Sequence, residues 1–379
     1  MIFDYETMRI IWWALLGALL IGFSVTGGFD LGVAVLLPFL GTNDNERRVI
    51  INSIGPTWEG NQVWFVMAGG ALFAAWPLAY AVSFSSLYFP LLLTLFALFL
   101  RPLGFDYRSK LPNQTWRDTW DKALFIGGLI PAIIFGVAFG NLLVGIPFHL
   151  ENDMRMIYHG NMMTLLNPFS VLAGILSLSM FTMHGAVYLQ IKTEAAIQQR
   201  AKKKVRLFVP LTLAFFALAG YWLTFLDGYH ITSEIFPNGP SDPLDKFVKR
   251  EPGLWLDNYG HFPDLWLLPL TTFITGCITL VLSSINKPGS AFIFSAMTVA
   301  SIILTAGCSM FPFIIPSSIS INSSLTVWDS SSSLKTLTII FWVTAFFLPL
   351  IIIYTSWVFR ILRGKITVEH IKKNDHTAY

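Results

Sequence analysis

The sequence predicts an all-α, polytopic membrane protein of about nine transmembrane helices, arranged as two four-helix bundles plus one peripheral helix. Of the 379 residues, 54% are hydrophobic and 12% are charged, whereas soluble domains average about 25% charged residues. The apolar residues also fall in runs that reach the ~20 residues needed to cross a bilayer. The 13 Trp and 33 Phe residues suit aromatic belts at the membrane surfaces. The net charge of +3 gives no indication of a nucleic-acid partner.

Nine hydrophobic runs are long enough to be read as spans. They are residues 9–39, 49–75, 78–101, 123–146, 164–189, 207–227, 264–285, 290–313 and 336–359. The first run is expected to be tilted, kinked at Gly27-Gly28 or longer than the membrane. It is expected to be retained, because it lacks a basic region followed by a small-residue cleavage site. Residues 49–101 are too long for one span and are divided at Trp76-Pro77, because proline disfavours a continuous helix. Without that division there are eight spans.

The chain is expected to form one integral membrane domain over residues 1–379. Residues 1–146 are assigned to the first bundle, and residues 164–359 to the second bundle plus the peripheral helix, from the helix count alone. Most of the 25 Lys and Arg residues fall in loops on one side of the nine-span topology and in the tail after residue 360. The positive-inside rule makes that side cytoplasmic. The N-terminus is then outside and the C-terminus inside.

The most polar stretch within an apolar region is residues 52–65, NSIGPTWEGNQVWF. Glu59 lies about ten residues into its span, ~15 Å from the cytoplasmic end and near mid-membrane. Asp30 is expected at a similar depth on an antiparallel helix, so both carboxyls can face one polar cavity. A desolvated carboxyl can exchange protons near neutral pH, and Asn61 and Gln62 can order water there. Alternatively, both acids bond backbone amides freed by the kinks, and the sequence leaves these readings open.

Three other residues have competing interpretations. Arg101 ends a predicted span, either as a helix-end anchor or as a partner for a carboxylate or quinone oxygen. His184 reads as a hydrogen-bonded interior histidine more readily than as a haem ligand, because no second histidine is expected at its depth. Trp64 either packs between helices or borders an apolar passage for a small neutral molecule. Cys277 and Cys308 fit neither a disulfide framework nor a metal cluster, and no metal site is predicted.

Several long runs resemble one family. They are FDYETMRIIWWALLGALLIGFSVTGGFDLGV, NDNERRVIINSIGPTWEGNQVWFVMAGGALFAAWP, RPLGFDYRSK, GVAFGNLL, LTAGCSMFPFIIPSS and SSLTVWDSSSSLKTL, together with the closing tail. They resemble subunit II of the cytochrome bd ubiquinol oxidases, and the resemblance runs from Phe3 to Tyr379.

The resemblance implies a terminal oxidase of the bacterial inner membrane. The expected partners are a subunit I of homologous fold, often a small third subunit, membrane lipid, and the substrates ubiquinol and O2. Ubiquinol would pass electrons through haem b centres to haem d, where O2 is reduced to water. The haem ligands would belong to subunit I. Protons would come from the cytoplasm and be released outside. Some family members hold a ubiquinone in subunit II as a structural ligand.

By position, the resemblance assigns Glu59 to an acidic residue, usually aspartate, that begins a proton path toward haem d. Trp64 corresponds to a tryptophan near a proposed oxygen route, and Arg101 and Asp106 match the RPxGFDYR run. The family motif TDGFD reads TGGFD here, so Asp30 is retained and the second acid is missing. The predicted proton-path residues are therefore Glu59 and Asp30, with Trp64 and Arg101 near the oxygen route or a quinone.

Two alternatives belong to other classes. A proton-coupled secondary transporter also uses broken helices and carboxylates at the membrane midplane. An inert assembly scaffold would tolerate every single polar substitution that leaves the complex intact. Visible haem bands in a stable heteromer would favour the oxidase over the transporter, and a polar substitution that lowers the rate in an intact complex would exclude the scaffold.

Overall fold

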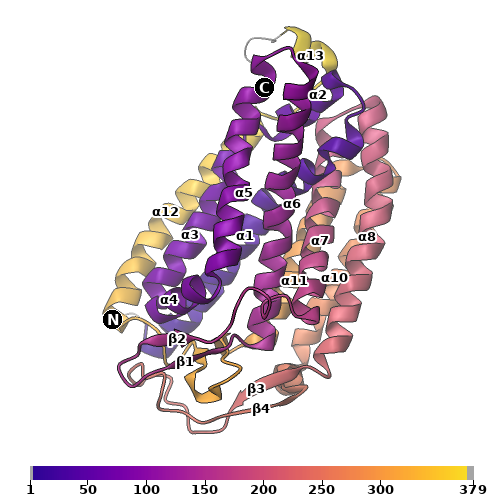
Figure 1. Ribbon diagram of the computed structural model, residues 1–379. Coiled ribbons are helices and arrows are strands. Elements are labelled where there is room, and N and C mark those ends of the chain that lie inside the picture. Colours follow the sequence, from indigo (N-terminus) through magenta and orange to yellow (C-terminus); the bar gives the residue numbers. More distant parts are fainter. Residues whose placement is uncertain (1–2, 374–379) are drawn as a thin grey trace.

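The computed structural model describes residues 3–373 and shows a bundle of long helices with small strands gathered at one end (Figure 1). We call this the strand end, and the opposite end, which carries α2 and α13, the α2 end. The helices are α1 (Tyr5–Leu40), α2 (Asp44–Ile54), α3 (Trp58–Ala75), α4 (Pro77–Ser86), α5 (Tyr88–Tyr107), α6 (Gln114–Val144), α7 (Pro168–Lys192), α8 (Ala195–Leu223), α9 (Asp257–His261), α10 (Leu267–Ser284), α11 (Pro288–Met310), α12 (Leu334–Ile361) and α13 (Val368–Lys373).

The predicted multi-pass helical fold is confirmed. Within the described residues, 8 helices are long and apolar enough to cross a membrane: α1, α5, α6, α7, α8, α10, α11 and α12. Each overlaps one of the predicted spans. α3 is not among them, because its first residues, Trp-Glu-Gly-Asn-Gln, are too polar. The division of the chain into two four-helix units stays a prediction.

The second predicted span, 49–75, is not one helix. A turn at residues 55–57 separates α2 from α3. Pro56 has no backbone N–H and its ring clashes with the preceding helical turn, which disfavours a continuous helix at this point. α2 and α3 follow each other from the α2 end toward the strand end (Figure 1). The polar stretch therefore lies at a helix break.

The third predicted span also needs a correction. Its start is confirmed, since α3 ends at Ala75 and α4 begins at Pro77. The helix expected over 78–101 is instead two helices, because α4 ends at Ser86 and α5 continues beyond the predicted boundary to Tyr107. Serine-rich sequence favours helix ends, and three serines occupy the last four positions of α4.

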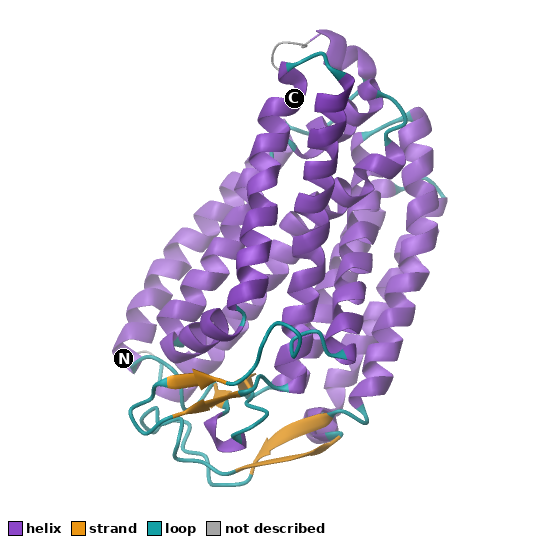
Figure 2. Ribbon diagram, in the orientation of Figure 1, coloured by secondary structure: helices purple, strands orange, loops and turns teal. Residues whose placement is uncertain are grey.

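Three small antiparallel sheets lie at the strand end (Figure 2). They are formed by β1 (Phe148–Leu150) with β2 (Met156–Tyr158), β3 (Asp227–Ile231) with β4 (Val248–Pro252), and β5 (Phe313–Ile315) with β6 (Leu325–Thr326). In register, Phe148 is opposite Tyr158, Asp227 opposite Pro252, and Phe313 opposite Thr326. The sheets lie within connections between helices, so the long helices define the architecture.

α7 is the most buried of the long helices and packs on α1, α6, α8 and α11. Glycines let its backbone approach closely. A Cβ on Gly32 of α1 would lie against the carbonyl of Phe181, 2.6 Å from its carbon, and a Cβ on Gly185 of α7 would lie 2.6 Å from the Val33 nitrogen. Small residues at a membrane helix crossing allow this kind of contact. The α1–α7 crossing fixes the middle of α1, which carries Asp30.

Unlike α7, α12 has few buried residues, and it lies at the edge of the bundle (Figure 1). It is tied at both ends. At the strand end, Trp12 Nε1 donates to the Leu337 carbonyl over 3.0 Å. At the α2 end, Lys192 Nζ donates to the Leu362 carbonyl, and Ile371 of α13 is fully buried.

A network of arginines and aspartates joins α2, α6 and the turn that follows α5 at the α2 end. Arg108 is buried and contacts Asp121 at 2.5 Å and Asp44 at 2.9 Å. Arg47 contacts the same Asp121 at 2.9 Å. Because Asp121 is shared by two arginines and is itself buried, it holds α2 against the start of α6.

Candidate functional site

The candidate site is built on the break between α2 and α3. Thr57 Oγ1 donates to the Ile54 carbonyl at 3.2 Å, which partly satisfies the end of α2. The Tyr188 hydroxyl of α7 donates to the Ser53 carbonyl at 2.9 Å. Tyr188 itself stacks on Phe29 of α1, with ring centroids 4.0 Å apart. The break is therefore held from α7 and α1, and α3 starts at a fixed place.

Asp30 is the buried acid of the site. It is fully buried in α1, and its Oδ2 accepts a hydrogen bond of 2.7 Å from Asn61 Nδ2 of α3. Its Oδ1 has no hydrogen-bond partner among the described residues. Buried carboxylate oxygens are nearly always bonded, so this atom marks a place for ordered water or a group from a partner chain.

Arg101 of α5 is the buried cation. It is fully buried and interacts electrostatically with Asp30. Its guanidinium lies 5.4 Å from the centre of the Trp58 ring, a cation–π distance. None of its three side-chain nitrogens has a hydrogen-bond partner among the described residues. A Cβ on Gly127 of α6 would lie 2.8 Å from Arg101 Cγ, so that glycine makes room for the side chain.

Glu59 lies on the other side of α3. Residues 59 and 61 are two positions apart and therefore ~200° apart around a helix, so Asn61 faces Asp30 while Glu59 is exposed. Glu59 heads an exposed stripe on α3 that continues with Val63, Val66, Gly70 and Phe73. The structure thus brings Asp30, Asn61 and Arg101 together and sets Glu59 on the outer face.

Three further residues near the predicted site are placed as follows. Trp64 is half-buried, and its ring fills a notch at Gly22 of α1, where a Cβ would lie 2.6 Å from it. Its Nε1 has no hydrogen-bond partner among the described residues. Asp106 is exposed near the end of α5, outside the buried cluster. Thr26 is occupied by its own helix, since its hydroxyl donates to the Gly22 carbonyl at 2.7 Å.

His184 is a hydrogen-bonded interior histidine, as favoured from the sequence. It is fully buried, its Nε2 donates to the Val25 carbonyl at 3.0 Å, and its Nδ1 lies 2.8 Å from Ser295 Oγ. The ring stacks on Phe292 with centroids 4.6 Å apart. Because both ring nitrogens have partners, neither presents a free lone pair to an iron.

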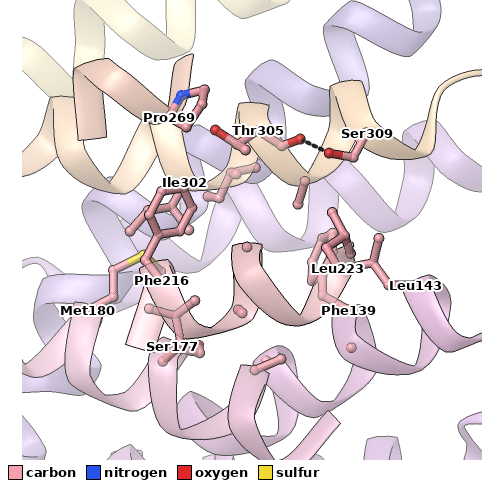
Figure 3. A pocket seen from close by; sticks show the side chains of 18 of the residues that line it. Phe139, Leu143, Ser177, Met180, Phe216, Leu223, Pro269, Ile302, Thr305 and Ser309 are labelled. Carbon is pink, nitrogen blue, oxygen red and sulfur yellow. Dashed lines mark hydrogen bonds between the residues drawn. The ribbon is translucent and has the colours of Figure 1, made fainter. Parts of the chain in front are cut away.

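An apolar cavity of about 520 Å³ lies between α1, α6, α7, α8, α10 and α11. Figure 3 shows its lining, in which Phe139, Met180, Phe216 and Ile302 are among the apolar side chains. Hydroxyl groups gather at one edge, where Ser309 Oγ donates to the Thr305 carbonyl at 2.8 Å. Sequence reasoning missed this cavity, because its lining comes from seven separate segments with no common motif.

Sequence reasoning also missed the role of Asn61. It was expected to order water beside an acid, but it bonds Asp30 directly. The two-residue spacing between Glu59 and Asn61 could have indicated this, because on a helix it places the two side chains on opposite faces, so only one of them can face Asp30.

Comparisons with known proteins cover nearly the whole chain. The sequence model of the family described as "Cytochrome bd terminal oxidase subunit II" matches residues 8–362. The chain is 48% identical over 377 residues to "Cytochrome bd-I ubiquinol oxidase subunit 2" of Escherichia coli K12, covering 99% of this chain and 100% of that protein. It is 32% identical to "Cytochrome bd ubiquinol oxidase subunit 2" of Bacillus subtilis, covering 95% and 97% of the two chains. The fold is similar to a chain of the bd oxidase structure from Geobacillus thermodenitrificans, with a TM-score of 0.71, 19% identity, and coverage of 94% and 98%.

Proposed function

The chain belongs to the cytochrome bd terminal oxidase subunit II family, and on that basis we propose that it works in an inner-membrane ubiquinol oxidase beside a subunit I. The complex oxidises ubiquinol, reduces O2 to water, takes protons from the cytoplasm and releases protons outside. The observation that supports this most directly is the 48% identity over the full length of a ubiquinol oxidase subunit 2. The eight apolar helices agree with a multi-pass membrane protein.

We place the haem b and haem d centres in subunit I. His184, the histidine within the long apolar helices of the described part of the chain, is not free to bind a haem iron, because both of its ring nitrogens are hydrogen-bonded. The described residues also contain no group of three or more His, Cys, Asp or Glu side chains that can hold a metal. The contribution of this chain is then structural support and proton handling.

The exposed face of α3 is the surface that we assign to subunit I. An ionisable side chain facing lipid costs several kcal/mol, yet Glu59 is exposed at the head of a stripe of apolar residues. A protein partner that covers Glu59 would keep the carboxyl out of lipid and so remove this free-energy cost. Gly70 lies in the same stripe, and a Cβ there would meet nothing within 4 Å, so a helix of the partner can approach closely.

Glu59 is then the proton carrier at the boundary between the two subunits. Its side chain lies next to the α2–α3 break, where water from the α2 end can reach it, and it faces the partner that would hold the haems. Asp30, Asn61 and Arg101 form a buried polar cluster behind it, and the unbonded atoms of Asp30 and Arg101 favour ordered water. Asp30 is proposed as the second carboxyl of this path.

Two further assignments concern the small molecules. We propose that Trp64, which is half-buried in the notch at Gly22, borders the route of O2. The cavity of Figure 3 suits a structural ubiquinone: its apolar walls match an isoprenoid chain, and the edge near Thr305 and Ser309 is the polar side toward which the quinone ring would lie. Arg101 lies apart from that cavity, since it is not among the lining residues.

The α2 end, where α13 and the Arg–Asp network lie, is assigned to the cytoplasm.

The test uses the purified complex. Glu59→Gln and Glu59→Ala are expected to lower ubiquinol oxidase turnover while the haem spectrum shows normal assembly, and Glu59→Asp is expected to retain activity. Glu194→Gln is the matched control, because Glu194 is an exposed acid that makes no cap hydrogen bond at the start of α8. Full turnover in a well-assembled Glu59→Ala complex would reject the proton role. A colourless chain without a haem-bearing partner would reject the oxidase.

A further inference from the structure

Two histidines on the β1–β2 hairpin take no part in the site described above. His149 lies in β1, and His159 follows β2 directly, at the strand end (Figure 1). His149 Nδ1 lies 2.8 Å from His159 Nε2, and the ring centroids are 4.9 Å apart. We propose that these two side chains form a surface site for a divalent first-row transition-metal ion, with Cu(II) as the preferred ion.

The strand register brings the two side chains to one face. His149 is opposite Ile157, and His159 N donates to the Pro147 carbonyl at 2.9 Å. The two histidines are therefore diagonal neighbours across an antiparallel pair, whose Cβ atoms are ~7–8 Å apart and within reach of long side chains. Their proximity follows from the backbone pairing.

The hairpin backbone is fixed from the opposite face. Phe148 and Leu150 alternate with His149 and are both buried. Ser317 Oγ donates to the Phe148 carbonyl, and Leu150 N donates to Ser323 Oγ at 3.2 Å. The neighbours of His149 are thus anchored to the segment after β5, and binding a metal requires little ordering of the backbone.

The separation of the nitrogens fits a right-angled metal better than a tetrahedral one. With metal–nitrogen bonds of ~2.0–2.1 Å, adjacent nitrogens of a square-planar ion are ~2.9 Å apart and those of a tetrahedral ion are ~3.3 Å apart. The present separation is 2.8 Å. The two nitrogens are therefore already about as close as adjacent ligands of a tetragonal Cu(II) ion, although their lone pairs do not yet converge. Cu(II) also binds nitrogen ligands most strongly among these ions.

Metal binding replaces the contact between the two rings. The hydrogen bond uses one N–H and one lone pair, so the protonated nitrogen must shift its proton to the other ring nitrogen, and both rings must turn until their lone pairs converge on the ion. His159 is exposed and His149 is half-buried, so both rings have room to turn. With two protein ligands, water completes the coordination.

This site was not predicted from the sequence. The two histidines are ten residues apart and match no metal-ligand spacing. Only the hairpin register brings them together.

The experiment measures copper on the assembled oxidase complex after treatment with a chelator. The complex is titrated with Cu(II) in a glycine buffer that competes for free ion, and bound copper is counted by elemental analysis after desalting. Wild type is expected to hold one more copper per complex than His149→Gln or His159→Gln. Loss of a ligand is expected to weaken this binding tenfold or more, since even an outer-shell change costs about 10–100-fold. The copper EPR signal of wild type is expected to show coupling to two nitrogens.

His261→Gln is the matched control, because His261 is a single exposed histidine at the same end of the molecule. It is expected to hold as much copper as wild type. The haem spectrum of each variant reports assembly independently of copper, and an alanine variant at each position guards against an assembly defect of one substitution. Equal copper in wild type and in an assembled complex that carries both His149→Gln and His159→Gln overturns the proposal. So does a wild-type complex that takes up no copper.

Discussion

The α1–α7 crossing allows one substitution to be followed from geometry to function. A Cβ at Gly32 would lie 2.6 Å from the carbonyl carbon of Phe181 and 3.2 Å from the Thr182 Cα. Both are backbone atoms, so no side-chain rotation can relieve the contact. Ordinary carbon–carbon contacts begin near ~3.5 Å, and the helices must separate by roughly 1 Å. Overpacking of this kind typically costs about 1–3 kcal/mol.

The expected result is that Gly32→Ala lowers the thermal denaturation midpoint of the purified complex. Gly17→Ala, in the same helix, is the matched control, because a Cβ there would meet nothing within 4 Å. Without a clash, Ala is favoured over Gly in a helix interior by roughly 0.5–1 kcal/mol, so this variant should match or slightly exceed wild type. The two substitutions are therefore predicted to have opposite signs.

Gly32→Ala should also lower turnover, because moving α1 away from α7 displaces Asp30. Asp30 lies two residues from Gly32, and its contact with Asn61 depends on where α1 sits against its neighbours. Thermal denaturation is followed by the haem absorbance, and turnover by oxygen consumption with ubiquinol. A Gly32→Ala complex as stable as Gly17→Ala would show that the crossing is looser than the backbone geometry implies.

Three further substitutions test other parts of the molecule. Asn61→Leu removes the donor to Asp30 and should lower the stability of the complex by about 1–3 kcal/mol. Turnover should also fall, and it should fall less in Asn61→Gln, whose longer amide can still donate to the acid. Asp121→Ala removes the 2.5 Å partner of the buried Arg108, which keeps only Asp44. It should lower the denaturation midpoint, with about 3–5 kcal/mol, the cost of breaking a buried ion pair completely, as the upper bound. Ala219→Trp places a large ring in the apolar cavity and should reduce the ubiquinone that co-purifies, measured by solvent extraction and chromatography, while the haem spectrum stays unchanged.

The overall helical architecture was predictable because it depends on span length and composition. Runs of ~20 apolar residues leave few alternatives in a bilayer. The division at Trp76-Pro77 was also predictable, since proline acts on the local backbone. The interruption at residues 55–57 was not predicted and residues 49–75 were read as one span, because a proline inside an apolar run can either kink a helix or end it.

The site was predictable in residue types but not in arrangement. Asp30 and Glu59 were identified because buried acids are rare in membrane helices. Which of them meets Arg101, and which faces outward, depends on the rotation of α3 about its axis. The position of Gly127, where a side chain would collide with Arg101, also depends on packing between helices that are distant in sequence. Local patterns carry no information about that packing.

The position of α7 has a consequence for biosynthesis. This helix carries the buried polar residues His184 and Gln190, and its close contacts are made with α1 and α6, which the ribosome delivers first. A groove between those two earlier helices must therefore stay open to lipid until α7 enters the bilayer. Ribosome-bound intermediates in which α6 has entered the bilayer while α7 is still inside the ribosome should expose that groove to lipid-soluble crosslinkers, and release of α7 should protect it.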